Sequence, residues 1–102
     1  MSKINRLLIA NRGEIAVRII RTAKEMGITT ISIYSEVDKN SPHVYLADES
    51  YLVGDAPSSS SYLDMEKVLE VAKVSKADAI HPGYGFLSEN SLFAKKAVKR
   101  GF

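Results

Sequence analysis

Two short loops carry the residues of this chain that could bind a ligand. The later loop is the run His81-Pro82-Gly83-Tyr84-Gly85. Because glycine lets a ligand approach the backbone closely, the two glycines would leave the Tyr84 ring projecting between them. Ser88 follows as a good N-cap for a helix, and the free amides of a helix start suit an anion such as a carboxylate or bicarbonate. The run therefore predicts a binding loop for a small ligand.

The same run also has a structural interpretation. His81 would then be a hydrogen-bonded histidine of the fold, and Phe86 and Leu87 would fill the core. Glu89 would serve the first turn of the following helix, where the helix dipole favours negative charge. His81 and Glu89 are therefore secondary candidates, after Tyr84, for contact with a ligand.

The earlier loop is the run Asn11-Arg12-Gly13-Glu14-Ile15-Ala16. Two of its residues match the dinucleotide fingerprint G-x-G-x-x-G/A, but Asn11 replaces the first glycine. Asparagine tolerates left-handed backbone, so the turn could still form, and Glu36 or Asp38 lies about where an acid would bind ribose. Glu14 argues against this site because it would place a carboxylate beside the phosphate. The alternative is a tight structural turn in which the small Ala16 lets a helix pack closely.

Other residue types give weaker indications of chemistry. The two histidines, His43 and His81, are too few and too far apart in sequence to indicate a metal site, and no metal is expected. The chain has no cysteine, which excludes disulfides and thiol nucleophiles. The acidic pair Asp48-Glu49 is expected to form a solvated edge.

The apolar pattern predicts the elements that position these loops. Residues 7–10 form a continuous apolar run, typical of a strand that is covered on both faces. From residue 14 the apolar residues recur at helical spacing until Gly27, a good helix terminator. Another face of this helix is either solvated or a contact with a second protein, and it carries Arg18, Arg21 and Glu25.

The rest of the chain repeats this alternation. Strands are expected at residues 28–34, 49–53 and 78–81, a short helical turn at 44–47, and helices at about 65–72 and 88–100. Strands that alternate with helices imply right-handed crossovers and a parallel sheet. The predicted fold class is α/β, a three-layer, Rossmann-like domain with a small parallel sheet that spans residues 1–102. In such sheets ligands bind beyond the carboxyl ends of the strands, where both loops lie.

Composition limits the class of partner. Of the 102 residues, 45% are apolar and 25% are charged, the balance of an ordinary soluble globule. The 14 basic and 12 acidic residues give a net charge of +2, too even to indicate nucleic acid or a membrane surface. No apolar run approaches the ~20 residues of a transmembrane helix, and the N-terminus lacks a signal-peptide core. Neither nucleic acid nor a membrane is therefore expected as a partner.

Several blocks of the chain resemble the opening segment of biotin carboxylases, in the order and spacing of that family. They are Leu8-Ile9-Ala10-Asn11-Arg12-Gly13-Glu14-Ile15-Ala16 with Arg18, Ala47-Asp48-Glu49, Ala56-Pro57 with Ser61-Tyr62-Leu63, and Ala79-Ile80-His81-Pro82-Gly83-Tyr84-Gly85-Phe86-Leu87-Ser88-Glu89-Asn90. The similarity covers essentially the whole chain, and the last block is long and specific. It implies a Rossmann-like pre-ATP-grasp domain, with an ATP-grasp domain and a C-terminal domain in the intact enzyme.

The resemblance also implies an activity for the intact enzyme. Biotin carboxylases are ligases that use MgATP to activate bicarbonate to carboxyphosphate, and the carboxyl then passes to N1 of biotin on a carrier domain. The implied cofactors are biotin, ATP and Mg²⁺, none of them bound by this segment alone. The implied partners are the ATP-grasp and C-terminal domains, the biotin carrier domain, a carboxyltransferase and a second copy in a homodimer. The implied compartment is the cytoplasm, or the mitochondrial matrix where a transit peptide has been removed.

The family supplies carboxyl groups to several acceptors, and this segment does not identify which one. Its members are components of acetyl-CoA carboxylase, which serves fatty acid biosynthesis, and of the propionyl-CoA, methylcrotonyl-CoA and pyruvate carboxylases. In that family the ATP-binding glycine-rich loop, the magnesium carboxylates and the main catalytic base lie downstream of the similar segment. No catalytic residue is therefore expected here, and the 102 residues alone should be inactive.

The resemblance assigns roles to few individual residues. Tyr84 matches the tyrosine that lines the biotin pocket beside the ureido ring, and Gly83 and Gly85 shape that loop. The run at Asn11 is a structural turn in the family, which argues against the alternative function, a dinucleotide-binding Rossmann domain of an oxidoreductase. The homodimer interface is implied near three residues of the first helix, namely Arg18, Arg21 and Glu25.

Overall fold

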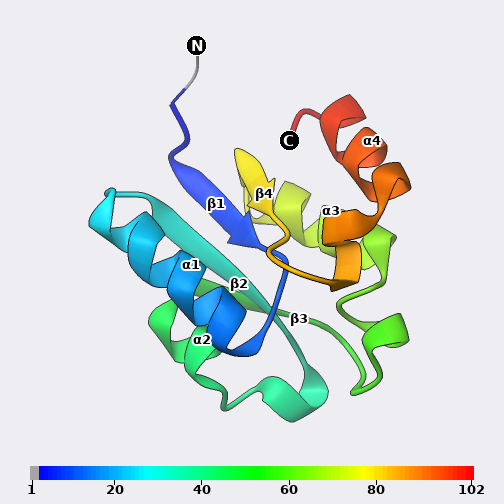
Figure 1. The fold of residues 1–102 in the computed structure, drawn as a ribbon, viewed down its shortest axis with the longest axis horizontal. Coiled ribbons are helices and arrows are strands. Elements are labelled where there is room, and N and C mark those ends of the chain that lie inside the picture. Colours follow the sequence, from blue (N-terminus) through cyan, green and yellow to red (C-terminus); the bar gives the residue numbers. More distant parts are fainter. Residues whose placement is uncertain (1–2) are drawn as a thin grey trace.

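The computed structural model describes residues 3–102 and has a four-stranded parallel sheet at its centre (Figure 1). The strands are β1 (Arg6–Ile9), β2 (Thr29–Ser35), β3 (Glu49–Gly54) and β4 (Ala79–His81). They lie in the order β3-β2-β1-β4, and all three neighbouring pairs are parallel. The predicted α/β class with a small parallel sheet is therefore confirmed.

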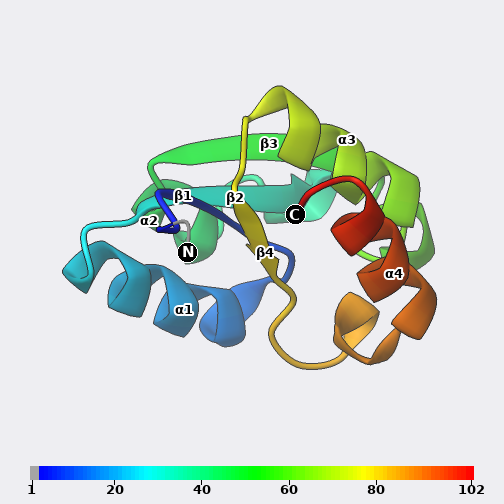
Figure 2. The same cartoon turned by 90° about the horizontal axis from the view of Figure 1, so that it is seen from above.

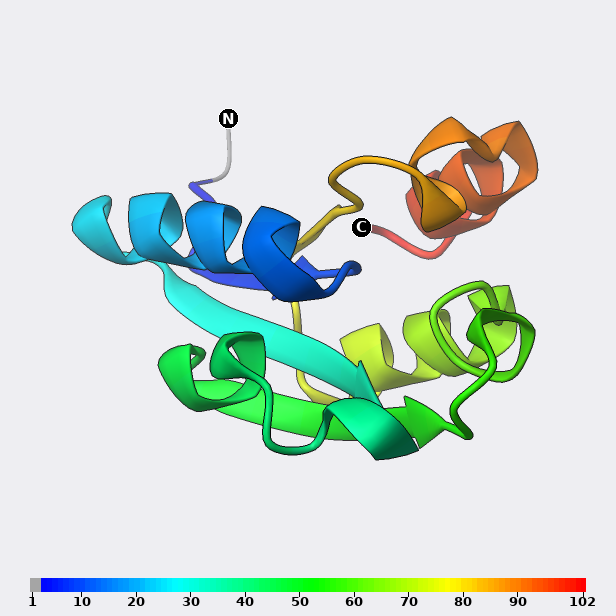
Figure 3. The same ribbon diagram turned by 60° about the horizontal axis from the view of Figure 1, so that its bottom comes forward.

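Helices cover both faces of this sheet (Figure 3). They are α1 (Gly13–Glu25), α2 (Pro42–Leu46), α3 (Met65–Val74) and α4 (Ser91–Lys99), with short 3-10 turns η1 (Glu36–Asp38), η2 (Ser58–Ser60) and η3 (Phe86–Glu89). The helices α1 and α2 pack on one face, and α3 and α4 pack on the other. Within residues 3–102 no helix is long and apolar enough to cross a membrane.

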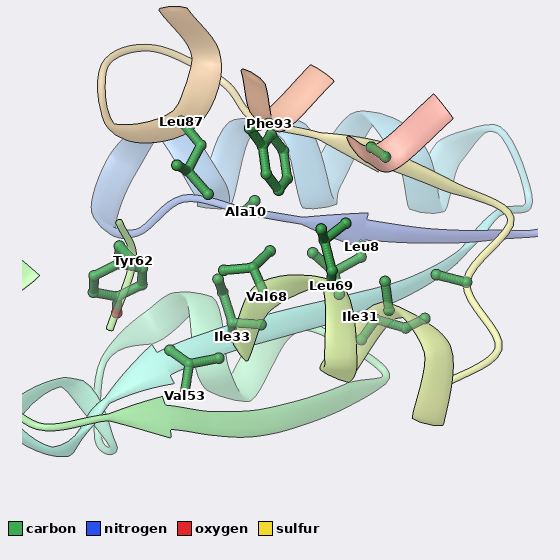
Figure 4. Close-up of a cluster of buried hydrophobic side chains, with 13 residues drawn as sticks. Leu8, Ala10, Ile31, Ile33, Val53, Tyr62, Val68, Leu69, Leu87 and Phe93 are labelled. Carbon is green, nitrogen blue, oxygen red and sulfur yellow. The ribbon is translucent and has the colours of Figure 1, made fainter. Parts of the chain in front are cut away.

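Alternate residues of β1 face the two helical layers, because successive side chains of a strand point to opposite faces of a sheet. Leu7 and Ile9 pack against Ala16 and Ile20 of α1. Leu8 points the other way, into a larger buried cluster (Figure 4). Coverage on both faces explains why β1 is a continuous apolar run in the sequence.

The larger cluster joins the sheet to α3 and α4. Figure 4 shows Ile31 and Ile33 of β2 facing Val68 and Leu69 of α3. Phe93 of α4 belongs to the same cluster and is drawn above β1 in this view. All five are buried, and each such side chain contributes roughly 1.5–3 kcal/mol relative to exposure. This layer holds the elements around β4 in place, although β4 itself is short.

One helix boundary differs from the sequence prediction. Ser88 is not the N-cap of the last helix, because it lies in η3 and α4 begins only at Ser91. Asn90 caps α4 instead, and its side-chain oxygen accepts a hydrogen bond from the N–H of Phe93 at 3.1 Å. Leu87 is buried, which anchors the preceding segment in the core and delays the start of the helix.

The acidic pair Asp48-Glu49 is partly solvated, as expected from the sequence, but both carboxylates are also bonded to the sheet. Asp48 accepts hydrogen bonds from the backbone N–H and the hydroxyl of Thr30, at 2.8 and 3.0 Å. Glu49 forms an ion pair with Arg6 at 2.6 Å. These bonds lower the pKa of both carboxyl groups. Both acids therefore link the start of β3 to neighbouring strands, Asp48 to β2 and Glu49 to β1.

Candidate functional site

The loops that follow β1 and β4 meet at one end of the sheet (Figure 2). Strand β1 has β2 as one neighbour in the sheet and β4 as the other. The chain reaches β2 from β1 through α1, which covers one face, and it reaches β4 from β3 through α3, which covers the opposite face. The strand order therefore reverses between β1 and β4. In open parallel sheets, ligands bind beyond the strand ends at such a switch point.

Asn11, the first of the residues between β1 and α1 that the sequence singled out, connects the two loops. It is completely buried, and its Nδ2 donates hydrogen bonds to the carbonyl oxygens of Pro82 at 2.8 Å and Tyr84 at 2.6 Å. Its Oδ1 accepts a hydrogen bond from the N–H of Arg12 at 2.8 Å. The β4 loop is thus hydrogen-bonded to a residue that lies more than 70 positions before it in the sequence.

The two glycines of the β4 loop both adopt left-handed backbone, with φ of +67° at Gly83 and +62° at Gly85. A Cβ at Gly83 would lie 2.8 Å from Cγ2 of Ile15 and 2.9 Å from Nδ2 of Asn11, whereas a Cβ at Gly85 would meet open space. The N–H of Gly83 donates a hydrogen bond to Nδ1 of His81 at 3.1 Å. Glycine is therefore required at 83 by conformation and by close approach, and at 85 by conformation alone.

Tyr84 stands beside an open groove, and it is 78% exposed, as the sequence predicted for a projecting ring. The groove has a volume of about 370 Å³, within the usual size of small-molecule sites. Glu14 and Arg18 form an exposed ion pair at 3.6 Å on its α1 side. The residues that line it are Glu14, Ile15, Arg18, Ile19, His81, Gly83 and Tyr84.

The structure therefore brings four of the candidate residues together and leaves four elsewhere. Gly83, Tyr84, His81 and Arg18 share the groove. Gly85 adjoins Tyr84 without lining it. Arg21 and Glu25 are exposed further along α1, and Glu89 is exposed in η3 rather than in the first turn of α4 as expected.

The residues that were alternatively assigned to structure behave as the structural interpretation predicts. Leu87 is buried, and the ring of Phe86 packs against that of Tyr62 with centroids 5.3 Å apart. His81 accepts a hydrogen bond from within its own loop. These contacts do not exclude a ligand, because Tyr84 takes no part in them.

A second group of polar side chains lies beyond the end of β2, with a buried carboxylate and a buried hydroxyl beneath the partly exposed Arg12 side chain. Asp38 is only 4% exposed, and its carboxylate accepts hydrogen bonds from the Arg12 guanidinium at 2.6 and 2.7 Å. The hydroxyl of Tyr62 donates to the same carboxylate at 2.6 Å and accepts from the N–H of Ser35 at 3.1 Å. Sequence reasoning missed this Asp38 network because Arg12 and Tyr62 lie 26 and 24 residues from Asp38 and follow no local motif.

Each titratable group of the Asp38 network is held in one protonation state. The hydrogen-bonded Arg12 guanidinium holds the pKa of Asp38 well below its usual range, and the carboxylate in turn raises the pKa of Arg12. Burial, followed by the hydrogen bond to Asp38, raises the pKa of Tyr62 to about 12. Burial also lowers the pKa of His43, whose Nε2 lies 3.1 Å from the carbonyl oxygen of Ile33. The network is therefore structural rather than a proton donor or acceptor near neutral pH.

These two regions do not support the dinucleotide alternative. An acid that binds ribose needs free oxygens, whereas the Asp38 carboxylate already binds Arg12 and Tyr62. Asn11 directs its amide into the β4 loop, and the side chain of Glu36 is exposed. In the part of the chain that the structure describes, no group of three or more His, Cys, Asp or Glu side chains could hold a metal ion.

Comparison with known proteins gives a consistent set of relatives. The sequence profile of the family described as "Biotin carboxylase, N-terminal domain" matches residues 3–102. The chain is 61% identical over 98 residues to the mitochondrial methylcrotonoyl-CoA carboxylase subunit alpha of Mus musculus, covering 96% of this chain and 14% of the relative. It is 57% identical over 102 residues to the pyruvate carboxylase of Staphylococcus aureus, covering 99% of this chain and 9% of the relative.

A solved structure shows the same fold. The biotin carboxylase domain dimer of Hydrogenobacter thermophilus 2-oxoglutarate carboxylase, in complex with MgADP, ADP and bicarbonate, superimposes with a TM-score of 0.94 at 45% identity. The match covers 100% of this chain and 22% of that one. The chain therefore spans a minor part of the length of each protein that it resembles.

Proposed function

Because this chain belongs to the biotin carboxylase N-terminal domain family, we propose that it supplies one wall of the biotin pocket in a biotin-dependent carboxylase. In the reaction of that enzyme, MgATP activates bicarbonate to carboxyphosphate, and the carboxyl passes to N1 of biotin on a carrier domain. The observation that carries the proposal is the exposed Tyr84 ring at the switch point of the sheet.

Tyr84, Gly83 and Gly85 are the residues that we assign to the biotin pocket. A ring that is 78% exposed at the edge of an apolar groove offers one free face to the ureido ring of biotin. Other side chains of this chain, such as Tyr45, are similarly exposed, and what distinguishes Tyr84 is its place on the lining of the groove. His81 and Glu89 take secondary places, because His81 supports the loop and Glu89 lies outside the groove.

We expect the rest of the catalytic machinery on other domains of the same enzyme. ATP and Mg²⁺ would bind the ATP-grasp domain, and the carboxyltransferase would take the carboxyl from the carrier to the acceptor. Identities of 61% to a methylcrotonoyl-CoA enzyme and 57% to a pyruvate enzyme are nearly equal, which supports a choice of acceptor made outside this domain. The compartment that we expect is the cytoplasm, or the mitochondrial matrix.

The face of α1 that carries Arg18, Arg21 and Glu25 is the surface that we assign to a homodimer interface. All three side chains are exposed, and the similar H. thermophilus biotin carboxylase domain was solved as a dimer. Sedimentation of the intact carboxylase and of its Arg21→Glu variant tests this assignment. A weaker dimer in the variant is expected, and an unchanged dissociation constant would contradict it.

Two preparations test the proposed function as a whole. The 102-residue chain should fold but hydrolyse no ATP in the presence of bicarbonate, whereas the polypeptide that also carries the ATP-grasp and C-terminal domains should do so and should carboxylate free biotin. In the longer protein, Tyr84→Ala should raise the KM for free biotin about tenfold or more, in line with the loss of about 1.4 kcal/mol or more of ring contact. ATP hydrolysis by the short chain, or an unchanged biotin KM, would overturn the proposal.

A further inference from the structure

We propose that Asn11 is a positioning residue that holds the Tyr84 loop in its ligand-binding conformation, an inference that rests on the proposed role of Tyr84. The side chain lies beneath the loop at the end of β1 and does not line the groove. It therefore acts on a ligand only through the backbone of residues 82–84.

The hydrogen-bonding capacity of Asn11 is matched to this loop. Both amide hydrogens are donated to loop carbonyls, to Pro82 at 2.8 Å and to Tyr84 at 2.6 Å, and Oδ1 accepts from Arg12. The two carbonyl groups belong to the peptide before Gly83 and the peptide after Tyr84, so they enclose both residues, and the backbone of Gly83 is left-handed at φ +67°. Because both peptide groups around the turn are fixed by one rigid amide, the direction in which the Tyr84 Cβ leaves the backbone is fixed as well.

Close packing reinforces this arrangement. The Cα of Gly83 passes so near to Nδ2 of Asn11 that an added Cβ would lie only 2.9 Å from it. The Tyr84 ring is 78% exposed, so neighbouring side chains contribute little to its orientation. The position of the ring is consequently set by the loop backbone, to which Asn11 gives two side-chain hydrogen bonds and His81 one.

The chemistry of the position favours asparagine over its nearest substitutes. Aspartate has the same shape, but the oxygen that replaces Nδ2 would face both carbonyl oxygens. The buried charge would keep only the Arg12 N–H as a donor. Glycine, the residue of the dinucleotide fingerprint, would leave both carbonyl groups without a side-chain partner. Only a side chain with two donors on one nitrogen makes both bonds at once.

Steady-state kinetics of the intact carboxylase with free biotin tests the proposal through Asn11→Asp. We expect the KM for biotin to rise about tenfold or more, since misplacement of a binding group by about 1 Å has effects of up to 100-fold. The KM for ATP should change by less than about twofold, since the proposal places ATP on another domain. A purely structural defect would instead lower the amount of active enzyme, and hence the apparent kcat, without raising the KM for biotin selectively.

Asn90→Asp is the matched control. Asn90 uses only its Oδ1, which accepts from the N–H of Phe93, and aspartate retains that acceptor. Asn90→Asp should therefore leave the KM for biotin and the KM for ATP unchanged. If Asn11→Asp lowers kcat alone or leaves the biotin KM unchanged, the positioning role is wrong.

Gly83→Ala gives a second route if Asn11→Asp does not fold. Its Cβ would press on the Asn11 amide and on Ile15, so it should also raise the biotin KM selectively, and an unchanged biotin KM would overturn the proposal. Tyr84→Ala separates this inference from the proposed function. Where Tyr84→Ala leaves the biotin KM unchanged, the assigned pocket fails, whereas an effect of Tyr84→Ala without one of Asn11→Asp refutes only the role of Asn11.

Discussion

Adjacent residues of one loop, Asn11 and Arg12, support two regions of opposite character. On one side Arg12 enters the Asp38 network, where the carboxylate and the Tyr62 hydroxyl are buried and fully hydrogen-bonded. On the other side Asn11 supports the Tyr84 loop, whose backbone is fixed but whose aromatic ring is exposed. Both regions lie at the carboxyl end of the sheet.

The difference shows how polar residues at a strand end divide between structure and binding. In the Asp38 network the carboxylate, the Arg12 guanidinium and the Tyr62 hydroxyl bond to one another within the chain, so the carboxylate has no capacity left for a ligand. Among the described residues, Nδ1 of His43 is buried without a hydrogen-bond partner. In the Tyr84 loop the internal bonds are made by the backbone, and the side chain stays free. A strongly shifted pKa at Asp38 therefore marks a structural network here rather than a reactive site.

The largest expected effect on stability comes from breaking the closed region. Asp38→Ala should lower the free energy of unfolding by about 3 kcal/mol, because Arg12 and Tyr62 lose their common partner while Tyr62 stays buried. Urea denaturation of the 102-residue chain measures it. A loss below about 1 kcal/mol would mean that the network is replaceable by solvent, and the contrast between the two regions would weaken.

Acid should produce a smaller loss at the same carboxylate, since protonation weakens its hydrogen bonds without deleting the group. The pKa of Asp38 is lowered in the folded state, so its contribution is fully present above the unfolded-state pKa of about 4 and is lost as the pH falls below that value. Denaturation at a series of pH values between about 5 and 2 should show this decline. Asp38→Asn should flatten it, and an equal slope in the variant would contradict the assignment.

Tyr62→Phe should have a moderate effect. It removes the hydroxyl that donates to Asp38 and accepts from Ser35, but it keeps the buried ring, so we expect a loss of about 1.5 kcal/mol. The Asp38 carboxylate retains both bonds from Arg12. Thermal denaturation compares this variant with the parent chain, and a loss as large as that of Asp38→Ala would show that the ring position, not the bond, is what matters.

Tyr84→Ala should have the smallest effect on stability, within about 0.5 kcal/mol, because an exposed ring contributes few contacts. Its backbone carbonyl still accepts from Asn11 in the variant. Urea denaturation of the Tyr84→Ala and Tyr62→Phe variants measures how the free energy of unfolding depends on one exposed and one buried tyrosine. A destabilisation of Tyr84→Ala as great as that of Tyr62→Phe would remove the distinction between the two regions.

The sequence was sufficient for those features that depend on local pattern. The apolar run at residues 7–10 identified a strand covered on both faces, and the helical spacing after it identified α1 up to Gly27. The glycines around Tyr84 indicated its exposure correctly. These properties follow from the side-chain period of strands and helices and from backbone freedom at glycine.

Features that depend on contacts between distant residues were not predictable in this way. Ser88 and Asn90 are both good caps, and the burial of Leu87 decides between them. The partners of Asp48 and Glu49 are Thr30 and Arg6, which lie 18 and 43 positions away in sequence, so no local pattern indicates these bonds. Asn11 stands where the dinucleotide fingerprint has glycine, and the reason is visible only in the fold, where its amide donates to Pro82, 71 residues later.

The most direct test of the account is a double comparison in the intact carboxylase, between Tyr84→Ala in the open region and Asp38→Asn in the closed one. For each variant, the KM for free biotin and the midpoint of thermal unfolding are measured on the same preparation. We predict that Tyr84→Ala raises the biotin KM with little change in the midpoint, and that Asp38→Asn lowers the midpoint with little change in the biotin KM. A rise in biotin KM for Asp38→Asn that equals or exceeds that for Tyr84→Ala would contradict the account.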